Sequence, residues 1–112
     1  MRNALILSAV RTPIGDFDGM LKPFTGVELG ALALAEAVKR AGAQPSEVDQ
    51  VMFAMARQAG AGPNPARQMA IRAGLPFEVP AWTLNMACAS SLQAIALAAR
   101  AGEFLEGDAP LG

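Results

Sequence analysis

A single cysteine, Cys88, is the strongest nucleophile in the sequence, and it stands in the stretch TLNMACASSLQA, residues 83–94. The chain contains no histidine, the base that most often activates a thiol or a hydroxyl. Chemistry at Cys88 must therefore activate the thiol by other means. The neighbouring residues are all small and leave room for an acyl group: Ala87, Ala89, Ser90 and Ser91.

The pattern around Cys88 predicts a junction between a strand and a helix, because residues 81–84 are strand-like and residues 88–101 are apolar at helical spacing. At the first turn of a helix, unpaired backbone N–H groups and the helix dipole favour an anion, and hence a thiolate. The same N–H groups can hold the oxyanion that forms when a thiolate attacks a carbonyl. An inert, packed cysteine explains the residue equally well, because free cysteine is among the most buried residue types.

Alternating apolar runs and helical patterns predict an α/β fold of β-α-β-α-β-α order with a mostly parallel central sheet. Two helix starts carry capping signals. Thr25 and Glu28 have the spacing of a capping box, and Asn64 precedes Pro65 at a first helical position. The expected strands are residues 4–10, 51–55 and 81–84, and the expected helices are residues 29–41, 66–73 and 88–101.

Composition excludes several classes of protein. The 112 residues suffice for one domain, and nine Lys and Arg against ten Asp and Glu give a net charge of -1, which argues against a nucleic-acid partner. No apolar run approaches the roughly 20 residues that span a bilayer, so no membrane partner is expected. One cysteine without histidine predicts no metal site and no internal disulfide, and a reducing cytoplasm is the expected compartment.

Three stretches resemble the amino-terminal half of a thiolase of the acetyl-CoA acetyltransferase type. They are ILSAVRTPIGDFDGMLKPFTGVELGALALAEAVKRAG, GPNPARQMAIRAGLP and NMACASSLQAIALAAR, in the family's order and spacing. The resemblance implies a thiolase-like α/β fold in which residues 1–101 form a partial N-terminal domain. The sheet of this half-domain is expected to be incomplete and mixed. Residues 102–112 depart from the family and are expected to form a coil tail.

The resemblance also implies a function. Cys88 is expected to be the nucleophile that takes the acyl group of acyl-CoA as a thioester, with its backbone N–H contributing to an oxyanion hole. Acyl-CoA and CoA are then substrates, no separate cofactor is needed, and fatty acid metabolism is the implied setting. A full-length enzyme is expected to be a homodimer or tetramer, and Trp82 is either an interface residue or a core residue.

Departures from the family leave two alternatives open. Ser91 stands where the family carries glycine, and Pro63 where it carries glutamine. Thiolases are also several times longer, and their second half supplies the activating histidine and a second cysteine, so the isolated chain is expected to be inactive. A ketoacyl synthase is an alternative, because ACASS resembles the nucleophile motif of those enzymes. A non-catalytic truncated or frameshifted product is the other.

Overall fold

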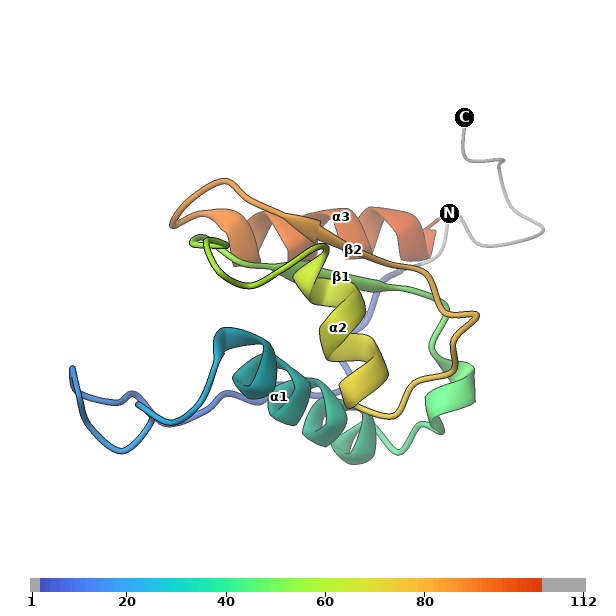
Figure 1. The fold of residues 1–112 in the computed structure, drawn as a ribbon. Helices are drawn as coiled ribbons and strands as arrows, with labels where there is room; N and C mark the ends of the chain where they lie inside the picture. Colours follow the sequence, from blue (N-terminus) through green and yellow to red (C-terminus); the bar gives the residue numbers. More distant parts are fainter. Residues whose placement is uncertain (1–2, 104–112) are drawn as a thin grey trace.

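Two short parallel strands form the sheet of this protein, in a computed structural model that describes residues 3–103 (Figure 1). Strands β1 (Val51–Ala54) and β2 (Ala81–Leu84) pair in register from their first to their last residues. Parallel strands need a crossover connection, and helix α2 (Pro65–Arg72) supplies it. The predicted α/β class is therefore confirmed, with two of the expected strands formed.

The other helical elements are α1 (Gly26–Arg40), the short 3₁₀ helix η1 (Pro45–Glu47) and α3 (Ser90–Glu103). Helix α1 starts earlier than predicted because Thr25 is its N-cap, and the hydroxyl of Thr25 accepts a hydrogen bond from the Glu28 N–H at 3.1 Å. In the described part of the chain, none of the helices is long and apolar enough to cross a membrane.

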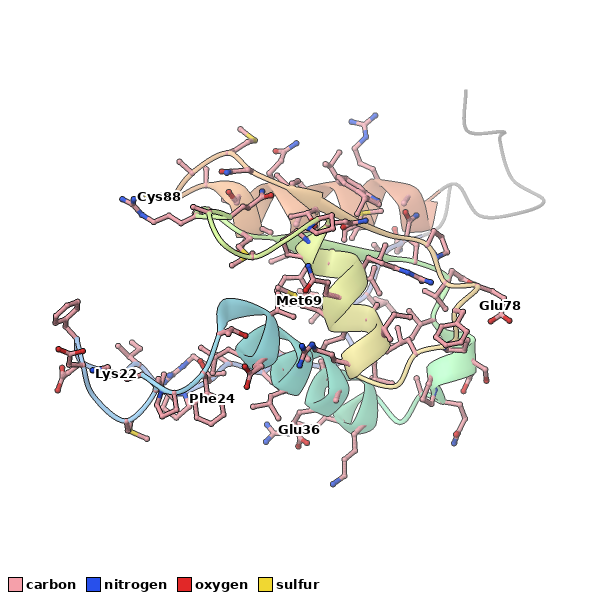
Figure 2. The ribbon with its side chains drawn as sticks, viewed as in Figure 1. Lys22, Phe24, Glu36, Met69, Glu78 and Cys88 are labelled. Carbon is pink, nitrogen blue, oxygen red and sulfur yellow. The ribbon has the colours of Figure 1, made fainter. Side chains whose placement is uncertain are left out.

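Two helices, α1 and α2, lie on one side of the sheet, and α3 lies on the other (Figure 1). Figure 1 shows α2 on one face, with α1 packed against α2, while α3 lies along the other face and contacts β1. Where α1 meets α2, Gly30 faces Met69: a Cβ at Gly30 would lie 2.8 Å from Cε of Met69, and the end of that side chain would have to shift. Figure 2 shows Met69 between the two helices. The buried apolar cluster consists of Val51, Ala70, Leu75 and Val79.

Residues 4–10 form no strand, which corrects the prediction from their apolar run. A strand forms where a neighbouring strand pairs with its N–H and C=O groups, and within residues 3–103 the sheet contains β1 and β2 alone. The run therefore stays unpaired, and Ile6 is 82% exposed. Its side-chain link to the rest of the fold is the Ser8 hydroxyl, which donates to the Ala37 carbonyl of α1 at 2.7 Å.

The last helix is shifted along the sequence relative to its prediction. It begins at Ser90, not at Cys88, and it ends at Glu103. Residues 102–103, which the sequence analysis assigned to a coil tail, therefore belong to α3. The remainder of that predicted tail, residues 104–112, lies outside the described residues.

Candidate functional site

Cys88 lies in the loop between β2 and α3, at the carboxyl end of the sheet, as Figure 2 shows. In open α/β sheets ligands bind at the carboxyl ends of the strands, where the loops project. The cysteine is free and exposed. The predicted junction between a strand and a helix is confirmed, and the side chain is not buried as the packed-cysteine alternative requires.

The chain bends sharply just before the cysteine. Ala87 adopts the left-handed backbone conformation, with φ of 51°. A residue with a Cβ pays roughly 1–2 kcal/mol for this conformation, so other interactions must hold it. Ala87 therefore lies outside α3, which starts at Ser90, and Cys88 precedes the first turn of that helix.

Two polar side chains hold this segment, residues 85–90, which we call the cysteine turn. The Ser90 hydroxyl accepts a hydrogen bond from the Met86 N–H at 2.8 Å and donates one to the Ala87 carbonyl at 2.5 Å. The Asn85 side-chain carbonyl accepts a hydrogen bond from the Ala87 N–H at 2.8 Å. Ser90 is only 3% exposed, so its two hydrogen bonds are shielded from water. The backbone before Cys88 is thus fixed from both sides.

The cysteine turn is also tied to the loop that follows β1. The Asn85 side-chain amide donates to the Ala56 carbonyl at 3.1 Å. Ala56 stands two residues past the end of β1, so this bond joins the loops at the carboxyl ends of both strands. The Asn85 side chain therefore couples the position of the cysteine turn to that of the loop after β1.

Strand β2 is fastened to the start of α2. The Thr83 hydroxyl donates to the Asn64 side-chain carbonyl at 2.9 Å and accepts from the Ala66 N–H at 2.9 Å. The Asn64 amide donates to the Ala81 carbonyl at 2.9 Å. Asn64 also caps α2 by accepting from the Arg67 N–H, which confirms the predicted cap. These bonds fix the strand that leads to Cys88.

The position of Trp82 fits either of its two predicted roles, an interface residue or a core residue. Its side chain is half-buried, and its indole N–H donates to the Gln50 side-chain carbonyl at 3.0 Å. The polar group of Trp82 is therefore satisfied within the chain. Whether the ring faces a second subunit stays a prediction.

A cavity of about 390 Å³ lies between the start of α1, the loop after β1 and α2. Gln68 shapes it, because its side-chain amide donates to the carbonyls of Ala61 and Pro63 at 2.8 and 2.9 Å and so holds the loop against α2. In the described chain, Cys88 does not contribute to the lining of this cavity. The cavity and the exposed thiol are separate features.

The cysteine turn offers a nucleophile and a backbone donor but no base. Among residues 3–103 no three His, Cys, Asp or Glu side chains gather as metal ligands, and the sequence contains no histidine. Over the same residues, no backbone carbonyl accepts the N–H of Cys88. This donor can therefore stabilise negative charge that forms beside the sulfur. The arrangement suits attack on an activated carbonyl, not proton removal from carbon.

The residues that build the turn were not predicted from the sequence. Ser90 was expected only to be a small neighbour of Cys88, and no role was expected for Asn85 or Thr83. A signal was available, since Asn, Ser and Thr side chains readily bond to nearby backbone groups and favour turns and helix starts. Asn85 and Ser90 flank the cysteine at the spacing such a turn requires.

Comparisons with known proteins identify the family. The family described as "Thiolase, N-terminal domain" matches residues 4–108. The chain is 46% identical over 111 residues to an acetyl-CoA acetyltransferase of Cupriavidus necator. This match covers 99% of this chain and 28% of that protein. It is 53% identical over 95 residues to a cytosolic acetyl-CoA acetyltransferase of Gibberella zeae. That match covers 85% of this chain and 24% of the Gibberella protein.

A solved structure gives the same result. The crystal structure of a thiolase from Ascaris suum in complex with coenzyme A matches with a TM-score of 0.86 and 36% sequence identity. The match covers 91% of this chain and 27% of that one. The chain thus spans about a quarter of the length of the relatives it matches. The fold, the matched residues and the identity together show that this chain belongs to the thiolase family, with residues 4–108 matching its N-terminal domain.

Proposed function

We propose that the protein takes part in acyl transfer between acyl-CoA thioesters, with Cys88 as the nucleophile. The observation that carries this proposal is the exposed thiol of Cys88 in a fixed turn before α3, within a chain of the thiolase family. The names of the Cupriavidus and Gibberella relatives support acetyl-CoA as a substrate. The Ascaris thiolase, solved with coenzyme A, supports CoA as a molecule that this protein binds.

The proposed step is a thioester exchange. The thiolate of Cys88 attacks the carbonyl carbon of acyl-CoA, a carbon–sulfur bond forms, and the carbonyl electron pair moves onto oxygen. The backbone N–H of Cys88 donates to this oxyanion. When the intermediate collapses, the bond to the CoA sulfur breaks, and CoA leaves as a thiolate that takes up the proton lost by Cys88. The products are acyl-Cys88 and free CoA, and no separate cofactor is consumed.

The chain alone is proposed to stop at this thioester. Claisen condensation also needs a base that removes a proton from the carbon next to a second thioester. The 112 residues contain no histidine and no second cysteine. We therefore expect no turnover of acetoacetyl-CoA and CoA by this chain, and residues from elsewhere must complete the reaction.

Of the alternatives, the ketoacyl synthase is disfavoured, because the family match and the relatives are thiolases and acetyl-CoA acetyltransferases. The non-catalytic alternative makes a different prediction from ours, namely that Cys88 takes up no acyl group. We also propose a cytoplasmic location, which the cytosolic relatives of Gibberella zeae and Mus musculus support. A role in fatty acid metabolism is proposed from the family alone.

Self-association is proposed for the assembled enzyme, as a homodimer or tetramer. Its support is the exposed apolar side chains of α3, where Leu92 is 74% and Ile95 57% exposed. Such side chains on one helix face are typical of a surface covered by other protein. Sedimentation equilibrium of the chain with and without Leu92→Ser tests whether that face contacts a second copy.

Acylation of Cys88 is tested by mass spectrometry after incubation with acetyl-CoA. We expect an acetyl adduct on Cys88, formed faster than on a synthetic peptide of residues 83–94, which has the same sequence without the fold. The variant Cys88→Ala controls for acetylation of lysines. Equal rates for the protein and the peptide, or an adduct that survives in Cys88→Ala, would falsify the proposal.

A further inference from the structure

We propose that Ser90 is a positioning residue that aims the backbone N–H of Cys88 at the carbonyl oxygen of the bound acyl group. This inference rests on the proposed function of Cys88 and extends it to a residue that does not touch the substrate. Ser90 is buried beneath the cysteine turn, and its hydroxyl bonds to the backbone on the amino-terminal side of Cys88.

The geometry of the peptide group connects Ser90 to the N–H of Cys88. The Ala87 carbonyl and the Cys88 N–H belong to one peptide unit, which is planar and trans, so the two groups point in opposite directions. The Ser90 hydroxyl donates to that carbonyl at 2.5 Å, and the Ser90 N–H donates to it at 3.2 Å. Fixing the carbonyl fixes the direction of the N–H. In the described chain no backbone carbonyl accepts this N–H, which leaves it for the oxyanion.

The two preceding peptide units are held as well. The Met86 N–H donates to the Ser90 hydroxyl, and the Ala87 N–H donates to the Asn85 side chain, each at 2.8 Å. Side chains thus fix three successive peptide units before Cys88. The left-handed conformation of Ala87, which a non-glycine residue keeps only when its surroundings impose it, lies in the middle of this run. Loss of the Ser90 hydroxyl removes the side-chain hydrogen bonds of two of the three units and leaves the Ala87 carbonyl with the Ser90 N–H alone.

The test compares two reactions of the same thiol in the full 112-residue chain. Acetylation by acetyl-CoA passes through an oxyanion and needs the aimed N–H, whereas alkylation by iodoacetamide forms no oxyanion and does not. We expect Ser90→Ala to slow acetylation at least about tenfold while alkylation changes less than about threefold, since a lost oxyanion donor costs rate in acyl transfer only. Ser90→Thr retains the hydroxyl and is expected to restore acetylation. Ser46→Ala, on exposed η1, is the matched serine control and leaves both rates unchanged.

A purely structural role for Ser90 predicts that both rates change by the same factor, and that result overturns the proposal. If Ser90→Ala does not fold, Asn85→Ala carries the same test from an exposed position, with a smaller selective loss of acetylation expected. An unchanged ratio of the two rates in Asn85→Ala then overturns it. Failure of the proposed function is separate: the unaltered chain would be alkylated at Cys88 but never acetylated.

Discussion

The cysteine turn and the amino-terminal segment, residues 4–10, are opposites in how they are held. In the turn, Asn85 and Ser90 make side-chain bonds to nearby backbone groups, and a strained residue is kept in place. The amino-terminal segment is far more apolar, yet it is mostly exposed and is linked to α1 through Ser8. Apolar character alone therefore does not order a segment. A short segment is ordered locally by polar side chains that return to its own backbone.

The largest effect is expected from Thr83→Val, in strand β2, which leads into the cysteine turn. The substitution keeps the shape of the side chain but leaves the N–H of buried Ala66 without its acceptor, and we expect a loss of about 2 kcal/mol in the free energy of unfolding. Urea denaturation followed by circular dichroism measures it. Thr12→Val, in the chain that follows the amino-terminal segment, is the matched control and should have little effect. Equal losses in the two variants would contradict the contrast.

A smaller effect is expected from the strained residue of the turn. Ala87→Val is expected to lower the free energy of unfolding by about 1 kcal/mol, because a branched side chain fits the left-handed conformation poorly. Ala87→Gly is expected to unfold at the urea concentration of the parent or above it, because glycine adopts this conformation without strain. A stable valine variant together with a destabilised glycine variant would show that Ala87 is not left-handed in solution.

In the amino-terminal segment, Ser8→Ala removes the hydrogen bond to Ala37. We expect the global stability to stay nearly constant and the segment to open more often. Trypsin should then cleave after exposed Arg11 about fivefold faster, as a local loss of about 1 kcal/mol implies. The Ser46→Ala variant should be cleaved at the parent rate. Identical cleavage of all three proteins would show that Ser8 does not anchor the segment.

The smallest effect is expected from Ile6→Ser. Because Ile6 is 82% exposed, its replacement should change the free energy of unfolding by less than about 0.5 kcal/mol. Light scattering should show weaker aggregation, since an exposed apolar run is removed. A destabilisation as large as that of Thr83→Val would mean that residues 4–10 are paired in solution.

The sequence predicted best what depends on neighbours in the chain. The capping residues Thr25 and Asn64 were predicted correctly, although the predicted helices began at residues 29 and 66 instead of 26 and 65. The bounds of β2 matched the predicted strand, residues 81–84. The prediction of a strand at residues 4–10 was wrong because strand formation depends on a pairing partner elsewhere in the chain, which no local pattern reveals.

The position of Cys88 was half predictable. A strand followed by a helix located the cysteine at the junction, but the helix start was set too early. A turn with a left-handed residue, Ala87, precedes the helix, and apolar periodicity carries no information about such a turn. Likewise, the types of Asn85 and Ser90 do not reveal which backbone groups they bond to, and their role in the turn follows from those bonds.

The exposure of Cys88 also determines how the chain responds to oxidation. An exposed thiol before a helix start is open to peroxide, which converts it to a sulfenic acid. In many oxidant-sensing proteins a second cysteine of the same chain then closes a disulfide, but this sequence has no other cysteine. The sulfenic acid is then open to an external thiol, such as glutathione or a second copy of the chain, or to further oxidation. Under oxidising conditions the same atom that is proposed to carry the acyl group would carry glutathione or link two chains.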